Sequence, residues 1–233
     1  MRTTLISLAA VTVAALAPAG VEADTTSPRL PASSFSAHVD NAWFPLLPGT
    51  RWVYTGVKDG KPTRDVVTVT RETATIDGVP CVAVSDRLYI RGRLGERTTD
   101  WYSEDARGNV WYFGEETAEL DARGRVTSTE GTWRSGVDGA SAGLFMPAQP
   151  RVGQAALQEH YKGHAEDRFR VIGLFHSTLA PGAANALLTE ETTPLEPGTV
   201  DHKLYVRGIG TVLEQTEQGG DERNELVSVR RGG

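Results

Sequence analysis

The chain has 233 residues, with 24 Lys and Arg against 30 Asp and Glu, and a formal net charge of −6 at pH 7. This mild acidity argues against nucleic acid or an anionic membrane surface as a partner, because both require a basic face. Cys81 is the single cysteine. No internal disulfide can therefore form, and the apolar strand around Cys81 predicts a buried, unreactive thiol.

Residues 1–23 have the pattern of a secretory signal peptide. An apolar run from Leu5 to Leu16 follows Arg2, and Ala23 supplies the small side chain that a signal peptidase selects. The run is shorter than the roughly 20 residues that span a bilayer. We therefore expect cleavage before Asp24, a secreted protein in the extracellular space or periplasm, and no transmembrane segment.

The next 17 residues, 24–40, are rich in Ser, Thr, Pro and Ala, which predicts a disordered leader. Residues 41–233 are expected to form a single β-rich domain. Up to Trp133, short apolar segments are separated by turns such as Asp59-Gly60 and Asp77-Gly78. This spacing predicts an antiparallel meander with strands near 51–55, 66–70, 79–84, 88–90, 98–102, 110–113, 117–120 and 125–133.

The second half of the chain starts with a change in composition. Residues 135–158 are rich in Gly and Pro, and we expect a long loop there, of the kind that often serves function. Strands are then predicted near 158–161, 167–175, 184–192, 202–207, 210–217 and 226–229. The order of features in 65–115 is similar to that in 167–214, which suggests two similar sheet halves. The expected fold is mainly β, a curved antiparallel sheet or half-barrel.

Two segments resemble an uncharacterised family of exported bacterial β-meander proteins. They are the start F-P-L-x-P-G-T-x-W-V-Y at 44–54 and the segment D-W-Y…G-N-V-W-Y-F-G-E at 100–115. The resemblance extends over nearly all of the chain after the signal peptide. It implies a curved antiparallel sheet, similar at the level of fold to the half-barrel of periplasmic lipoprotein carriers, and it supplies no catalytic assignment.

Aromatic and acidic side chains gather in the segment that carries this resemblance. Strand alternation places Asp100 and Tyr102 on one face and Trp101 on the other, and a hairpin turn brings Trp111 or Tyr112 back beside them. Rings beside carboxylates are typical of a sugar-binding cleft, and paired acids could catalyse hydrolysis. The alternative is that the rings fill the core while the acids face solvent. The candidate catalytic acids are Asp100, Glu104, Glu115 and Glu159, and the candidate ligand-binding residues are Trp101, Tyr102, Trp111, Tyr112, His160 and Glu166.

His160 and His164 are the candidate metal ligands, because two His four residues apart share one face of a helix. The surrounding residues favour an extended segment or a polar turn, in which the two would lie roughly 13 Å apart, too far for one ion. We therefore expect no metal at this position. The sequence contains no phosphate-loop, dinucleotide or nucleophile-elbow motif, and no cofactor is expected.

These observations favour a secreted β-protein that binds an apolar or amphipathic ligand, or a cell-envelope component, in the concavity of its sheet. The expected partner is a small molecule, lipid or glycan. The alternative is a carboxylate-dependent hydrolase or lyase acting on extracellular carbohydrate. A third interpretation, a structural envelope protein, predicts no pocket.

Overall fold

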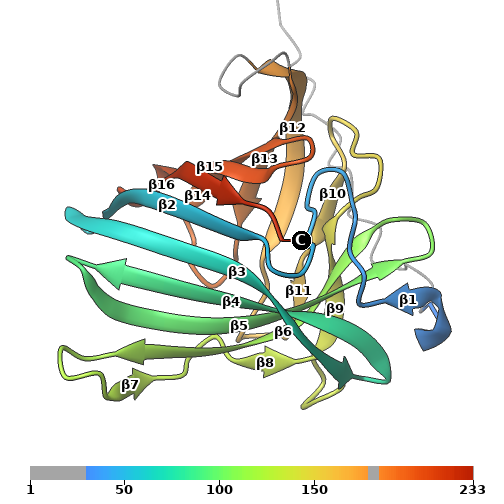
Figure 1. Ribbon diagram of the computed structural model, residues 1–233, viewed down its shortest axis with the longest axis horizontal. Coiled ribbons are helices and arrows are strands. Elements are labelled where there is room, and N and C mark those ends of the chain that lie inside the picture. The colour runs from blue at the N-terminus through green and yellow to red at the C-terminus, as the bar shows by residue number, and fades with distance from the viewer. Residues whose placement is uncertain (1–29, 178–183, 233) are drawn as a thin grey trace, which may run out of the picture.

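The computed structural model describes residues 30–177 and 184–232, so the predicted signal peptide and residues 24–29 lie outside the described part. An antiparallel sheet of 16 strands curves into a nearly closed, barrel-shaped structure with an unsealed seam (Figure 1). This confirms the predicted mainly β fold, and the sheet curls further than a half-barrel. Over the described ranges, no helix is long and apolar enough to cross a membrane.

A short 3₁₀ helix, η1 (Ala32–Ser34), precedes the strands. In chain order the strands are β1 (Phe35–Ser36), β2 (Arg51–Lys58), β3 (Lys61–Ile76), β4 (Val79–Ile90), β5 (Arg93–Asp105), β6 (Val110–Leu120), β7 (Val126–Ser128), β8 (Trp133–Arg134), β9 (Ser141–Met146), β10 (Ala155–Leu157), β11 (Glu159–His160), β12 (Arg168–Ser177), β13 (Ala184–Thr192), β14 (Val200–Val206), β15 (Gly210–Gln218) and β16 (Arg223–Arg230).

The sheet has its two ends at the seam. Its strand order is β10-β12-β13-β14-β15-β16-β2-β3-β4-β5-β6-β9-β11, with β1 paired to β5 and with β7 and β8 paired to β6. Most neighbours in this order are neighbours in sequence, as a meander predicts. The short strands β9, β10 and β11 bring the two ends together.

The tight hairpins have the turn chemistry that the sequence predicts. Asp59 and Gly60 both have positive φ, of 52° and 65°, between β2 and β3. Two consecutive residues with positive φ characterise the type I′ turn, whose twist matches that of the flanking strands. Asp77-Gly78 and Arg91-Gly92 repeat this pattern at the next two hairpins.

The sheet buries apolar side chains on both faces. Val82 and Val84 of β4 belong to the main core inside the barrel, whereas Cys81 and Ala83 belong to a smaller core on the outer face. Phe35 of β1 packs against this outer core. Cys81 is fully buried, and burial raises the pKa of its thiol to about 12, as expected for an unreactive cysteine.

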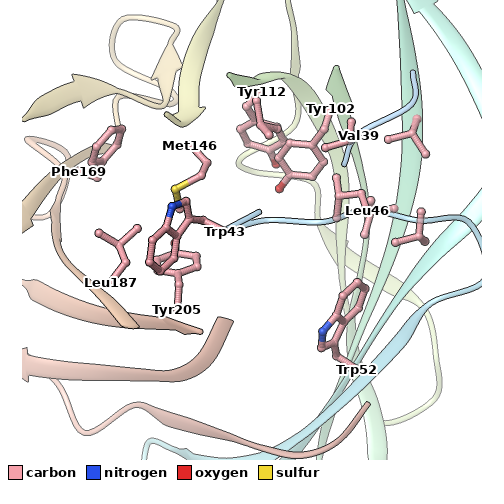
Figure 2. Close-up of a cluster of buried hydrophobic side chains, with 14 of the residues drawn as sticks. Val39, Trp43, Leu46, Trp52, Tyr102, Tyr112, Met146, Phe169, Leu187 and Tyr205 are labelled. Carbon is pink, nitrogen blue, oxygen red and sulfur yellow. The ribbon is translucent and has the colours of Figure 1, made fainter. Parts of the chain in front are cut away.

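The ordered part of the chain starts within residues 24–40, the segment predicted to be a disordered leader. Residues 32–36 form η1 and β1, and Val39 pairs with Leu46 in an isolated bridge. Val39, Trp43 and Leu46 are buried in the main core, and Figure 2 shows Trp43 and Leu46 inside the barrel. The prediction of disorder was therefore wrong for residues 30–40, because tertiary burial outweighs their polar composition.

We refer to residues 39–46 as the plug, because they fill one end of the barrel. Asn41 Nδ2 donates to the carbonyl oxygen of Gly108 at 2.7 Å, and the Gly208 amide donates to the carbonyl oxygen of Ala42 at 2.6 Å. These bonds fasten the plug to turns on opposite walls. The hairpin turns at 59–60 and 91–92 lie at the other end of the strands.

Residues 135–158 are not one long loop. They contain β9, with six residues, and β10, with three. Gly143 of β9 lies so close to the chain after β10 that a Cβ atom there would be 2.3 Å from the carbonyl oxygen of Gln158. The Gly-rich composition that suggested a loop serves here to let two backbones approach at the seam.

Candidate functional site

Three acids converge inside the barrel. Asp100 of β5 and Glu115 of β6 are directly opposed in the strand register, and both side chains are half-buried. The third acid, Glu159 of β11, is buried, and it is close enough to raise the pKa of Glu115. Of the four acids that the sequence singles out, Asp100, Glu115 and Glu159 therefore lie together.

Asp100 is held by a short hydrogen bond. Tyr112 Oη donates to Asp100 Oδ1 at 2.6 Å. Burial raises the pKa of Asp100 to about 7, and the bond from Tyr112 partly offsets this effect. Desolvation disfavours the charged carboxylate, whereas a donor favours it.

Glu115 and Glu159 hold their protons more firmly. Burial, and then the negative charges of Asp100 and Glu159, raise the pKa of Glu115 to about 9. Burial and Asp167 raise the pKa of Glu159 to about 8, although Trp133 Nε1 donates to Glu159 Oε1 at 3.3 Å. At neutral pH these two groups are largely protonated, which is the state of a general acid.

Glu104 lies apart from this cluster. Its Oε2 accepts hydrogen bonds from the backbone amides of Asp40 and Asn41, at 2.9 and 2.8 Å. Glu104 therefore anchors the start of the plug. The sequence places Glu104 in the same acidic and aromatic run as Asp100, but its carboxylate is hydrogen-bonded to the plug.

The aromatic candidates divide between the two faces of the sheet, as strand alternation predicts. Tyr102 and Tyr112 form a cross-strand pair inside the barrel and stack with ring centroids 4.7 Å apart (Figure 2). Trp101 belongs to the outer core, where the Arg134 guanidinium lies 4.4 Å from its ring centroid. Trp111 also lies on the outer face, and its Nε1 donates to Asp105.

A second polar group faces the interior from the opposite wall, and sequence reasoning missed it. Lys203 Nζ of β14 lies 2.9 Å from Glu191 Oε2 of β13 and 3.2 Å from Glu214 Oε1 of β15. Burial lowers the pKa of Lys203, but the two carboxylates outweigh it and the net shift is upward. The alternation of Asp201, Lys203 and Tyr205 along one strand face is the signal that could have revealed this group.

A pair of carboxyl groups completes the polar interior. Asp65 of β3 and Asp86 of β4 share a hydrogen bond, and burial raises the pKa of both. Both side chains are half-buried, and the side chain of Lys203 retains 23% exposure. Water therefore reaches these polar groups of the interior.

The seam carries a separate cleft on the outer face, with a volume of about 1150 Å³. β9 and β10 form its two sides, and residues 30–35 and the turn at 135–140 complete its lining. Its aromatic wall consists of Phe35, Trp111 and Phe113, with the Phe35 ring 6.2 Å from Trp111 and 5.5 Å from Phe113 between centroids. We call this the seam cleft.

His160 is the other sequence candidate at the seam cleft. Its side chain is exposed, and partial burial lowers its pKa. His164 stacks on Tyr161 with ring centroids 4.3 Å apart, and Glu166 Oε2 accepts the amide of Gly163 in the same turn. In residues 30–177 and 184–232, no group of three or more His, Cys, Asp and Glu side chains is arranged to hold a metal ion.

The chain matches no protein-family model and no curated protein. It has a weak likeness to a solved structure from Parabacteroides distasonis, described as a "putative lipoprotein". The TM-score is 0.42 at 11% sequence identity, covering 82% of this chain and 100% of the other.

Proposed function

We propose that the protein is exported and that its seam cleft binds the apolar part of an amphipathic small molecule. The signal-peptide pattern of residues 1–23 supports export. The observation that carries the binding proposal is the volume of the seam cleft, about 1150 Å³, which exceeds that of typical drug-sized sites.

The lining of the seam cleft fits an amphipathic ligand. Phe35, Trp111 and Leu157 present apolar surface, whereas Gln154 and His160 add polar groups. A largely apolar wall with a few polar groups is the usual composition of a small-molecule site. Burying an alkyl chain contributes about 0.8 kcal/mol per methylene group, so a chain of several carbons would bind measurably.

A cleft-filling substitution tests this proposal. Ala155 lines the seam cleft and belongs to neither hydrophobic core, so Ala155→Trp fills the space without disturbing the interior. We expect it to weaken the binding of a fluorescent alkyl probe about tenfold. Val227→Trp is the matched control, because Val227 is 57% exposed on β16, outside the cleft. Equal affinities for both variants would place the binding site elsewhere.

A carboxylate-dependent hydrolase or lyase acting on carbohydrate is the second candidate. The convergence of Asp100, Glu115 and Glu159 favours it, because such chemistry needs one protonated and one ionised carboxyl group. The test is turnover of a glycan panel by the wild type and by Glu115→Gln. Activity that Glu115→Gln abolishes supports this candidate, and the absence of turnover by the wild type removes it.

A further inference from the structure

Tyr102 has a buried ring and a hydroxyl group that is unpartnered in the described part of the chain. The Tyr102 side chain is 7% exposed, yet among the described residues its hydroxyl makes no hydrogen bond. Every fully buried polar side-chain atom of the described residues has a partner, so water must reach this hydroxyl. A phenol that is buried at the ring and unpartnered at the oxygen marks a place where a ligand can supply the missing bond.

The position of the Tyr102 hydroxyl follows from its neighbours. Tyr102 and Tyr112 are paired across β5 and β6 and stack at an interplanar angle of 15°. Both rings therefore project from the same face of the sheet, and the hydroxyl group of Tyr112 bonds to Asp100. Asp100, and more weakly Glu115, also raise the pKa of Tyr102, after burial itself. The free hydroxyl of Tyr102 thus lies close enough to Asp100 and Glu115 to interact with their charges.

The charged side chains around this cluster are mostly acidic. The acidic groups facing it come from β3, β4, β5, β6 and β11, and they are Asp65, Asp86, Glu96, Asp100, Glu115 and Glu159. The cation that faces Tyr102 from inside the barrel is Lys203, which is already paired with Glu191 and Glu214. Arg87 acts on Asp100, and Lys203 acts on Glu159, as weaker positive charges, so the acids around the cluster outnumber the cations.

We propose that the barrel interior binds a small organic cation, a protonated amine, beside Tyr102, Asp100 and Glu115. The ammonium group donates hydrogen bonds to the Tyr102 hydroxyl oxygen and to the two carboxylates. A bare metal ion is a poorer occupant, because the described acids do not form a coordinating group. This site is separate from the seam cleft and does not depend on the proposed function.

Binding of a cation here is coupled to proton release. The acids hold protons near neutral pH, as their raised pKa values show. An ammonium group beside them favours the carboxylate form, so a proton leaves as the amine binds. The ammonium group thereby takes the place of the released proton beside the carboxylates. The affinity for the amine is therefore expected to rise with pH until the amine itself loses its proton.

Isothermal titration calorimetry with propylamine and 1,4-diaminobutane tests the proposal, in two buffers of different ionisation enthalpy at pH 7. Propanol and glucose are the uncharged comparisons. We expect the amines to bind with proton release, and Tyr102→Phe to weaken them about fivefold or more. Glu119→Gln, an exposed change on β6, the strand of Glu115, and Ala155→Trp are expected to leave amine binding unchanged.

Three results would overturn the proposal. They are no amine binding at millimolar concentration, equal binding of propanol or glucose, or full amine affinity in Tyr102→Phe. Preferential binding of glucose would favour the carbohydrate hydrolase instead. Loss of alkyl-probe binding in Ala155→Trp bears only on the seam cleft, so the two proposals can fail independently.

Discussion

Asp100 and Glu115 face each other across β5 and β6, yet burial raises their pKa values to different levels, about 7 and about 9. The difference has a local cause. At Asp100 the 2.6 Å hydrogen bond from Tyr112 is the largest effect after burial. At Glu115 the negative charges of Asp100, Glu159 and Glu96 all outweigh the effect of Tyr112. One member of the pair can thus be ionised while the other remains protonated.

The stability of the protein is expected to fall as pH rises. Asp100, Glu159 and Glu115 have folded-state pKa values of about 7, 8 and 9, whereas unfolded carboxyl groups titrate near 4. Between these limits the folded state binds more protons than the unfolded state, so the free energy of unfolding decreases with pH. Each group contributes a slope of up to about 1.4 kcal/mol per pH unit.

Urea denaturation of wild type and Glu115→Gln at pH 6 and pH 9 measures this effect. The decrease in unfolding free energy between the two pH values should be smaller in Glu115→Gln by roughly 2 to 4 kcal/mol. Glu119→Gln, at an exposed position of β6, should retain the wild-type decrease. A Glu115→Gln profile that parallels the wild type would contradict the prediction.

Two tyrosine hydroxyl groups should differ in their effect on stability. Tyr112→Phe removes the donor to Asp100, which should cost about 1.5 to 3 kcal/mol above pH 7 and raise the pKa of Asp100 further. Tyr102→Phe removes a hydroxyl without a partner among the described residues and should change the unfolding free energy by less than about 0.5 kcal/mol. Thermal unfolding and carboxyl-carbon NMR titration give the two readouts, and equal destabilisation would contradict this assignment.

Local sequence rules predicted much of the fold and part of the interior cluster. Alternation with a period of two places Asp100 and Tyr102 on one face, and the hairpin returns Tyr112 to that face. The pairing of Asp100 with Glu115 follows once the register is known. These relationships depend on residues fewer than 20 positions apart, over which turn chemistry determines the geometry.

The remaining features depend on closure of the sheet. Glu159 reaches Glu115 because β9 and β11 curl the end of the sheet inward, and no local pattern encodes that curvature. The burial of Trp43 similarly depends on the walls around the plug. The sequence predicts a loop in place of β9 and β10 because residues 135–158 are rich in Gly and Pro. Gly143 serves close backbone contact there and not strand propensity.

The seam should be sensitive to a single methyl group. In Gly143→Ala the new Cβ atom would meet the carbonyl oxygen of Gln158 at 2.3 Å, so the two backbones must separate. We expect faster hydrogen exchange in β9 and β10 and a loss of about 2 kcal/mol or more in stability. Gly220→Ala is the control, because its nearest contact is the side chain of Thr216 at 3.2 Å. Unchanged exchange at β9 and β10 in Gly143→Ala would contradict a close seam.

Removal of Lys203 should destabilise the opposite wall in a pH-dependent manner. Lys203→Met leaves Glu191 and Glu214 without their counter-charge, and because the site is partly solvated we expect a loss of about 2 kcal/mol at pH 8. The loss should shrink towards pH 5, since burial raises the pKa of Glu191 and protonation relieves the unpaired charge. The double variant Lys203→Met/Glu191→Gln should recover part of the stability at pH 8. Denaturant titrations of the three proteins at both pH values provide the measurement, and a loss that is independent of pH would indicate a packing role for the lysine stem instead.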